Sequence, residues 1–243
     1  MSRRTLLLFV ILAGLSLALS AQGGELTFTS APARTHLLEL FTSEGCSSCP
    51  PAEAWLSKLK DAPGLWQNFV PMAFHVDYWD RLGWRDPFAS KVWTARQYEY
   101  SGRWNSSSVY TPGFVLDGRE WRNDGIPSVS AETPGILKIS MTSPDSVTAI
   151  FQPAKADGRS FDVHVARLGF GLKINVKAGE NSGRQLQHDF VVLSLADAAI
   201  GSGPKEVRLP ASTVASNSRG AIAAWVTETG KTEPIQAVGG WQR

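Results

Sequence analysis

The only two cysteines of the chain, Cys46 and Cys49, form a single C-x-x-C motif. Closing so short a loop restrains an unfolded chain little, so stability is a poor reason for the pair. Three kinds of chemistry remain, which are a redox-active dithiol, half of a metal site and an inert short-loop disulfide. A copper or zinc site would need ligands besides the two thiolates, and His75 or His36 are the candidates. No second cysteine pair exists to complete a zinc site, so we assign no metal ligand.

The cysteines stand within a pattern of strand, turn, helix and strand. Residues His36–Phe41 form a mostly apolar run of strand length, as expected for a strand covered on both faces. A turn-forming cluster, Thr42–Gly45, separates this run from the cysteines. Apolar residues then recur at helical spacing from Ala52 to Lys60, and Phe69–Val76 is the next apolar run. This order predicts a βαβ unit with the thiol pair at the carboxyl end of its first strand.

A thiol pair in this place is suited to disulfide exchange. A cysteine attacks as its thiolate, and the positive end of a helix lowers a Cys pKa from about 8.5 into a range of roughly 3.5 to 7.5. By this logic Cys46 is the nucleophile and Cys49 the resolving thiol. Pro50-Pro51 is expected to delay the start of the helix to Pro51, which would weaken the effect on Cys46. Sulfur atoms sealed in apolar packing would have no such role.

The segment Leu37–Lys60, with its C-x-x-C between strand and helix, resembles the active-site unit of the thioredoxin superfamily. The resemblance implies an α/β thioredoxin-like domain, with a central mixed sheet, flanking helices and a cis-proline loop that faces the dithiol. Residues Thr111–Gly118 are similar to that loop and the β-hairpin after it, with Asp117-Gly118 as the turn. The resemblance therefore implies that Pro112 is cis and that the backbone at Thr111 pairs with a substrate peptide beside the cysteines.

Three stretches carry a closer resemblance, namely Leu38–Cys46, His75–Asp80 and Gly179–Asn181. They are similar to a family of exported proteobacterial proteins, classed as a domain of unknown function with a thioredoxin-like fold. This resemblance supports the fold more strongly than the activity. Thioredoxins also have a buried acid that assists proton transfer, and Glu39 is the candidate here. We expect Glu39 to be exposed, because an isolated Glu rarely lies in a protein interior.

The chain departs from a minimal thioredoxin-like unit by an insertion over residues 77–108. It holds four of the nine tryptophans, namely Trp79, Trp84, Trp93 and Trp104. Asp86 before Pro87 is typical of a helix N-terminus and predicts a helix over Pro87–Tyr100. Its buried face would hold Phe88, Val92 and Ala95. We expect the rings to pack the insertion onto the sheet, with an aromatic rim that binds a partner as the alternative.

The C-terminal half reads as a β-rich module. Seven short apolar runs predict strands, namely Val147–Phe151, Phe161–Leu168, Leu172–Val176, Phe190–Leu195, Val207–Leu209, Ile222–Val226 and Ile235–Val238. They suggest an antiparallel sandwich or barrel-like module over residues 142–243, after a thioredoxin-like domain over 25–133. The loop Gly179–Arg184 is interpreted as a hairpin loop, with anion binding as an alternative. His164 and His188 are interpreted as structural.

The N-terminus reads as a secretory signal over residues 1–21, with Arg3 and Arg4 before an apolar run and small residues after it. The run is short for a membrane span, so no stable anchor is expected after its removal. Removing both arginines leaves 22 basic residues of 24 against 22 acidic ones. A near-neutral chain gives no reason to expect nucleic acid as a partner. We expect a periplasmic or secreted protein in an oxidising compartment.

These features together predict an exported thiol-disulfide oxidoreductase. Cys46 and Cys49 would react with a protein or small-molecule thiol or disulfide, and an unidentified redox partner would reset them. No cofactor is expected. Two alternatives are a binding module with an idle thioredoxin-like domain, and a copper or zinc handling protein that uses the thiolates.

Overall fold

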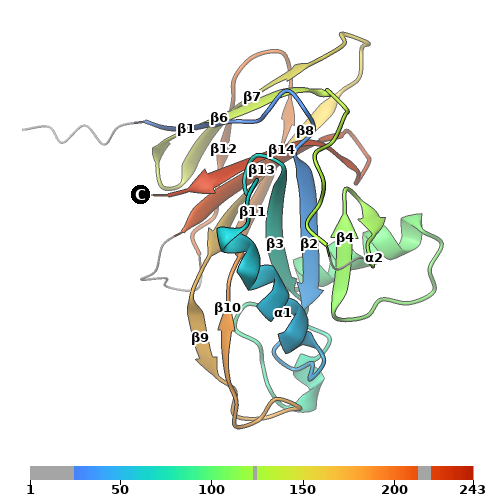
Figure 1. Cartoon of the computed structure of the whole chain (residues 1–243), viewed down its shortest axis with the longest axis vertical. Coiled ribbons are helices and arrows are strands. Elements are labelled where there is room, and N and C mark those ends of the chain that lie inside the picture. The colour runs from blue at the N-terminus through green and yellow to red at the C-terminus, as the bar shows by residue number, and fades with distance from the viewer. Residues whose placement is uncertain (1–24, 123–124, 213–219, 243) are drawn as a thin grey trace, which may run out of the picture.

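A computed structural model describes residues 25–122, 125–212 and 220–242 (Figure 1). The predicted signal segment, 1–21, lies outside the described residues. The largest element is an eight-stranded mixed sheet. In order across the sheet, its strands are β14 (Pro234–Trp241), β13 (Ala221–Glu228), β8 (Phe161–Gly169), β11 (Val191–Ile200), β3 (Phe69–His75), β2 (His36–Thr42), β4 (Gly113–Leu116) and β5 (Arg119–Glu120). The described chain is mostly β, with mixed and antiparallel sheets and few helices.

The predicted βαβ unit is confirmed. β2 and β3 run parallel, with His36 opposite Phe69 and Thr42 opposite His75. The helix between them, α1 (Cys49–Lys58), crosses one face of the sheet and ends in a short 3₁₀ turn, Leu59–Asp61. Every residue of β3 is buried, which explains its unbroken apolar pattern.

The predicted start of α1 at Pro51 is wrong, because the helix already begins at Cys49. Pro50 and Pro51 occupy the first helical turn, where a backbone N–H has no partner inside the helix and its loss costs nothing. The two prolines therefore leave the cysteines at the helix N-terminus.

The loop and hairpin after the insertion form as predicted. The Thr111–Pro112 peptide bond is cis. β4 pairs antiparallel with β2, and β5 pairs with β4. Asp117 and Gly118 form the turn with φ of 49° and 80°, the left-handed angles that a two-residue hairpin turn requires.

The helix of the insertion is present but begins later than predicted. α2 spans Lys91–Arg103, and the Ser90 hydroxyl caps it by accepting from the Val92 backbone N–H at 3.2 Å. The predicted buried face is also wrong, because Val92 is 61% exposed. The residues of α2 that face the protein interior are Trp93, Gln97, Tyr100 and Ser101. A short 3₁₀ helix, Asp80–Leu82, precedes α2.

All seven strands predicted in the C-terminal half are present, but they do not form a sheet of their own. β8, β11, β13 and β14 extend the sheet that contains β2 and β3, and β11 lies parallel to β3. Three further strands were not predicted, namely β1 (Leu26–Thr29), β6 (Gly135–Ser143) and β10 (Gln185–His188). A second sheet holds β1 (Leu26–Thr29), β6 (Gly135–Ser143), β7 (Ser146–Pro153) and β12 (Lys205–Arg208). β9 (Leu172–Asn175) and β10 (Gln185–His188) form a separate hairpin beside α1.

The C-terminal strands of the large sheet are covered on both faces. In β13, Ala221, Ala223 and Trp225 belong to the core that also holds Trp93 and Tyr100 of α2. The alternate residues Ile222, Ala224 and Val226 belong to a second core, packed against β6 and β7. Strands from both halves of the chain thus share one sheet. The division of the chain into domains over residues 25–133 and 142–243 remains a prediction.

Within the described ranges, no helix is both long and apolar enough to cross a membrane.

Candidate functional site

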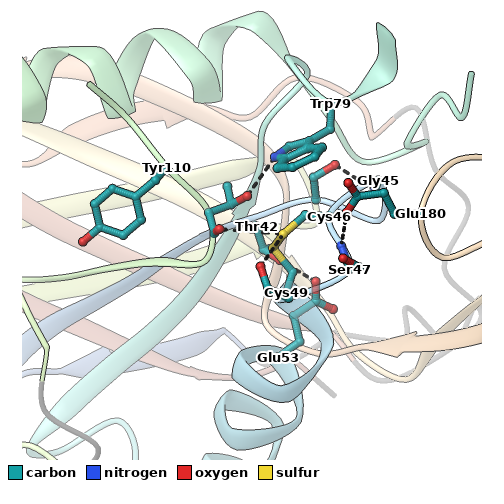
Figure 2. The surroundings of a disulfide bond; sticks show 12 residues. Thr42, Gly45, Cys46, Ser47, Cys49, Glu53, Trp79, Tyr110 and Glu180 are labelled. Atoms are coloured by element: carbon teal, nitrogen blue, oxygen red, sulfur yellow. Dashed lines mark hydrogen bonds between the residues drawn. A yellow bond between two sulfur atoms is a disulfide. The ribbon is translucent and has the colours of Figure 1, made fainter. Parts of the chain in front are cut away.

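Cys46 and Cys49 are joined by a disulfide between the end of β2 and the start of α1 (Figure 2). Their Cα atoms are 5.4 Å apart. The backbone N–H of Cys46 donates to the Ser43 carbonyl at 3.1 Å, and that of Cys49 donates to the Cys46 carbonyl at 3.2 Å. Two successive tight turns thus bring the cysteines from the strand to the first turn of the helix.

The structure brings the four predicted site residues, Cys46, Cys49, Thr111 and Pro112, to one place. The Sγ atom of Cys46 lies 3.8 Å from the carbonyl oxygen of Thr111, the residue before the cis-proline. The Thr111 hydroxyl accepts a hydrogen bond from the Trp79 indole N–H at 2.8 Å, so Trp79 lies over the same loop (Figure 2). The catalytic and substrate-binding roles of these residues remain predictions.

Both cysteines are buried, with no exposed surface on either residue. Their surroundings are partly polar. The Ser48 hydroxyl lies 3.2 Å from the Cys46 Sγ, and the Thr111 carbonyl oxygen contacts the same sulfur atom. Trp79 packs so closely on this loop that its Cβ would lie 2.8 Å from a Cβ added at Gly45. The sulfurs are therefore covered by one indole and several polar groups.

The loop of the β9–β10 hairpin holds the cysteine loop in position. The Asn181 side-chain amide donates to the carbonyl oxygens of Glu44 and Cys46 at 2.8 and 2.9 Å. Arg184 fixes the Asn181 side chain by donating to its Oδ1 at 2.7 Å. The Glu180 carboxylate accepts from the Ser47 backbone N–H at 2.9 Å, and this hydrogen bond lowers the Glu180 pKa. The predicted hairpin loop is confirmed, but its contact with the cysteines was missed.

A cluster of five buried titratable side chains lies behind the disulfide, namely Glu44, Glu53, His75, Asp86 and His188. His188 bridges two carboxylates, because its Nδ1 contacts Glu53 and its Nε2 lies 3.0 Å from Glu44. The Nδ1 of His75 lies 2.7 Å from Asp86, which also accepts from the Glu44 backbone N–H at 2.9 Å. We call these five residues the buried cluster.

The charges of the buried cluster stabilise one another. Burial lowers the pKa of His188, but the Glu53 and Glu44 carboxylates outweigh this effect and raise the pKa to about 10. Burial raises the pKa of Glu53, yet the positive charge and hydrogen bond of His188 leave it below its ordinary value. In the same way Asp86 raises the pKa of His75 against its burial, and His75 lowers that of Asp86.

Sequence reasoning missed the buried cluster for identifiable reasons. Glu53 stands four residues after Cys49, so both lie on one face of α1, and this spacing could have identified it. Asp86 was interpreted as a helix cap because a proline follows it. His188 was interpreted as a structural strand residue. Its partner Glu53 is 135 residues away in sequence, a separation that no local pattern reports.

The prediction that Glu39 is exposed is wrong. Glu39 is fully buried, and its carboxylate accepts from Arg96 Nε at 2.6 Å and from the Tyr100 hydroxyl at 2.5 Å. Both partners lie on α2, whereas Thr42 of the same strand contacts Glu53 on α1. Because neighbouring residues of a strand alternate between its faces, Glu39 lies on the face opposite α1. It is therefore not the acid behind the disulfide.

The four tryptophans of the insertion divide into two pairs. Trp93 packs edge-on against Phe74, and Trp104 stacks on Tyr100, as the packing interpretation expects. Trp79 and Trp84 instead contact the site, and the Trp84 indole N–H donates to Glu44 at 2.6 Å. Trp79 also packs against the core of the large sheet, so the packing interpretation holds for three of the four rings.

A cavity of about 430 Å³ opens beside the cis-proline loop. Tyr110 and Gly113, which flank Thr111 and Pro112, both line it. Its other walls include Gln97, Trp104, Glu120 and Arg122.

His36 is excluded as a ligand that joins the two thiolates. It lies at the opposite end of β2 from the cysteines, a distance of about 20 Å for a seven-residue strand. Its side chain contacts Asp117 instead, at 2.5 Å.

Comparisons with known proteins place the chain in a family. Residues 37–227 match the family described as "Protein of unknown function (DUF1223)", and the chain belongs to it. It is similar to a protein from Agrobacterium tumefaciens whose X-ray crystal structure is known. That similarity has a TM-score of 0.56 and 29% identity over 85% of this chain and 94% of the other. HBP35 of Porphyromonas gingivalis has a similar fold, with a TM-score of 0.57 and 15% identity over 87% of this chain and 76% of the other. No curated protein matches the chain.

Proposed function

We propose that this member of the DUF1223 family is an exported thiol-disulfide oxidoreductase that acts through Cys46 and Cys49. The observation that carries the proposal is the contact between the Cys46 sulfur and the Thr111 carbonyl, across a loop with a cis-proline. A sulfur at a helix N-terminus, beside the backbone of a cis-proline loop, is what a thioredoxin-like fold offers to a substrate disulfide. We assign α1, β2, β3, β4 and β5 to such a fold.

The proposed reaction is a pair of thiol-disulfide exchanges. In the reduced protein, the Cys46 thiolate attacks one sulfur of a substrate disulfide, and the second substrate sulfur leaves as a thiolate that takes up a proton. The Cys49 thiolate then attacks Cys46 Sγ in the mixed disulfide. This step forms the Cys46–Cys49 disulfide and releases the first substrate sulfur as a thiol. The substrate is reduced, the protein is oxidised, and a redox partner of the thiol class restores the dithiol.

Burial of the sulfurs requires that the substrate displace a covering group. Trp79 is that group, because its indole is held to the loop by a single hydrogen bond to Thr111 and is half-buried. Displacement of the ring would uncover the Thr111 backbone for a substrate strand. The cavity beside Tyr110 would then receive the substrate side chain next to the reacting cysteine.

The proposal is tested by the reduction of insulin disulfides with dithiothreitol as the reductant. We expect the wild-type protein to accelerate the reaction and Cys46→Ser to abolish the acceleration. Cys49→Ser should accumulate a mixed disulfide with the substrate, visible by mass spectrometry, because it lacks the resolving thiol. His164→Gln, a strand histidine paired with Asp197, serves as the control that leaves the rate unchanged. Equal rates for wild type and Cys46→Ser would refute the redox function.

A further inference from the structure

Each histidine of the buried cluster has one ring nitrogen fixed by a carboxylate. Asp86 holds the Nδ1 of His75 at 2.7 Å, and Glu44 holds the Nε2 of His188 at 3.0 Å. Of the opposite nitrogens, His188 Nδ1 contacts Glu53, and the one that remains on His75 is Nε2. A carboxylate behind each imidazole is the usual arrangement around a metal-binding histidine, since it fixes the ring and increases its basicity.

One of these two nitrogens has no partner. His75 is fully buried, and no hydrogen-bonding atom of the described residues satisfies its Nε2. A buried polar atom without a partner costs about 1–3 kcal/mol. The rings of His75 and His188 pack edge to face with their centroids 5.1 Å apart. His75 therefore lies beside the ring that contacts Glu53.

We propose that Glu53, His75 and His188 bind one divalent transition-metal ion, with Zn²⁺ the best fit. The candidate ligand atoms of the three residues all lie within 4.8 Å of one another. Two ligands of a tetrahedral zinc ion lie about 3.3 Å apart, so small side-chain movements complete the site. Two imidazoles and one carboxylate are a common zinc donor set, and they exclude Ca²⁺ and Mg²⁺, which prefer oxygen ligands alone.

The charge of the buried cluster also suits the ion. Three carboxylates are buried beside two imidazoles. A divalent cation would offset the negative charge of two of these carboxylates, which are costly to bury without a positive partner. The ion would join α1, β3 and β10, three elements far apart in sequence. The site is separate from the thiol pair and does not depend on the proposed redox function.

The test is the metal content of the protein. The full chain is produced with zinc in the medium and purified without a metal-affinity step, because an enclosed site is filled most easily during folding. We expect about one zinc per chain by elemental mass spectrometry, bound by three protein ligands with the fourth position open. The control His164→Gln should keep the ion, and His75→Gln and His188→Gln should lose it. The double variant Cys46→Ser/Cys49→Ser should also keep the ion, which separates this site from a thiolate site.

X-ray absorption at the zinc edge of the wild-type protein keeps the proposal testable if the histidine variants do not fold. We expect nitrogen and oxygen ligands only. Zinc far below one ion per chain in the wild type overturns the proposal. A sulfur ligand, or loss of zinc in the double cysteine variant, overturns it equally, because the ion would then be bound by the thiolates.

Discussion

At the scale of residues, we expect the Trp79 indole to limit access to the disulfide. Trp79 covers the cysteine loop and donates to Thr111, so its removal should expose the sulfurs without changing their bond. We expect Trp79→Ala to be reduced by dithiothreitol at least several times faster than the wild type, with an unchanged far-ultraviolet spectrum. Trp104→Ala is the matched control, because that ring stacks on Tyr100 and donates to the Gly118 carbonyl. A rate in Trp79→Ala equal to that of the wild type would show that the indole is not the barrier.

The stability of the chain should depend on pH through His36. The Asp117 hydrogen bond raises the His36 pKa, partly opposed by burial and by Arg34. Nδ1 of His36 faces the Asp117 carboxylate and Nε2 faces the Ser128 carbonyl. Both partners accept hydrogen bonds, so only a ring with a proton on each nitrogen can donate to both. Because the folded-state pKa is raised, this stabilisation is complete below about pH 6.5 and is lost as pH rises through the folded-state value.

The variant His36→Gln tests this dependence by urea unfolding at several pH values. At low pH it should lower the free energy of unfolding by about 1.5 kcal/mol, the low end for a hydrogen bond to a charged group, because the pair is only part-buried. The difference from the wild type should shrink at alkaline pH. A difference that is constant over the whole range would mean that the charge of His36 contributes nothing.

At the scale of elements, the β9–β10 hairpin supports the cysteine loop from outside the βαβ unit. Asn181→Ala removes two hydrogen bonds and leaves the Glu44 and Cys46 carbonyls without these donors. We expect a loss of about 2–3 kcal/mol in the free energy of unfolding, measured with urea. Gln185→Ala, on the exposed side of the same hairpin, should cost less than about 0.5 kcal/mol. Similar losses in the two variants would mean that the hairpin does not brace this loop.

The elements also show what the sequence can and cannot predict. β2, α1 and β3 were predictable because burial on both faces of a strand and helical spacing are local patterns. β6 was missed because most of it falls between the two predicted domains, the first ending at residue 133 and the second beginning at 142. The start of α2 was predicted too early, because Asp86 before Pro87 resembles a helix cap. The Asp86 carboxylate instead contacts Nδ1 of His75. The contacts of Asn181 and His188 join residues more than 130 positions apart, which no local pattern encodes.

At the scale of the whole molecule, the two halves of the chain share one core. The backbone N–H of Ala73 on β3 donates to the carbonyl oxygen of Phe190 at 2.8 Å. Phe190 directly precedes β11. Phe69 and Phe74 belong to the same apolar cluster as Phe190 and Trp225. A chain that ends at residue 133 would therefore expose one edge of β3 and a large part of this cluster. Because a domain is stable by only about 5–15 kcal/mol, it cannot lose so much buried surface and stay folded.

We therefore expect residues 25–133, produced alone, to lack a cooperative thermal transition and dispersed amide resonances. The full chain should unfold in urea in one transition, with tryptophan fluorescence and far-ultraviolet circular dichroism giving the same midpoint. Trp225 lies in the C-terminal half, and the Cζ atom of Arg96 on α2 lies 5.1 Å from the centre of its ring. Tryptophan fluorescence therefore reports on contacts between the two halves. Two separate transitions, or a folded N-terminal fragment, would mean that the sheet joins two units that fold independently. A single transition would mean that the cysteine loop depends on the C-terminal half for its position. Asn181 and His188, which contact Cys46 and Glu44 of this loop, both belong to that half.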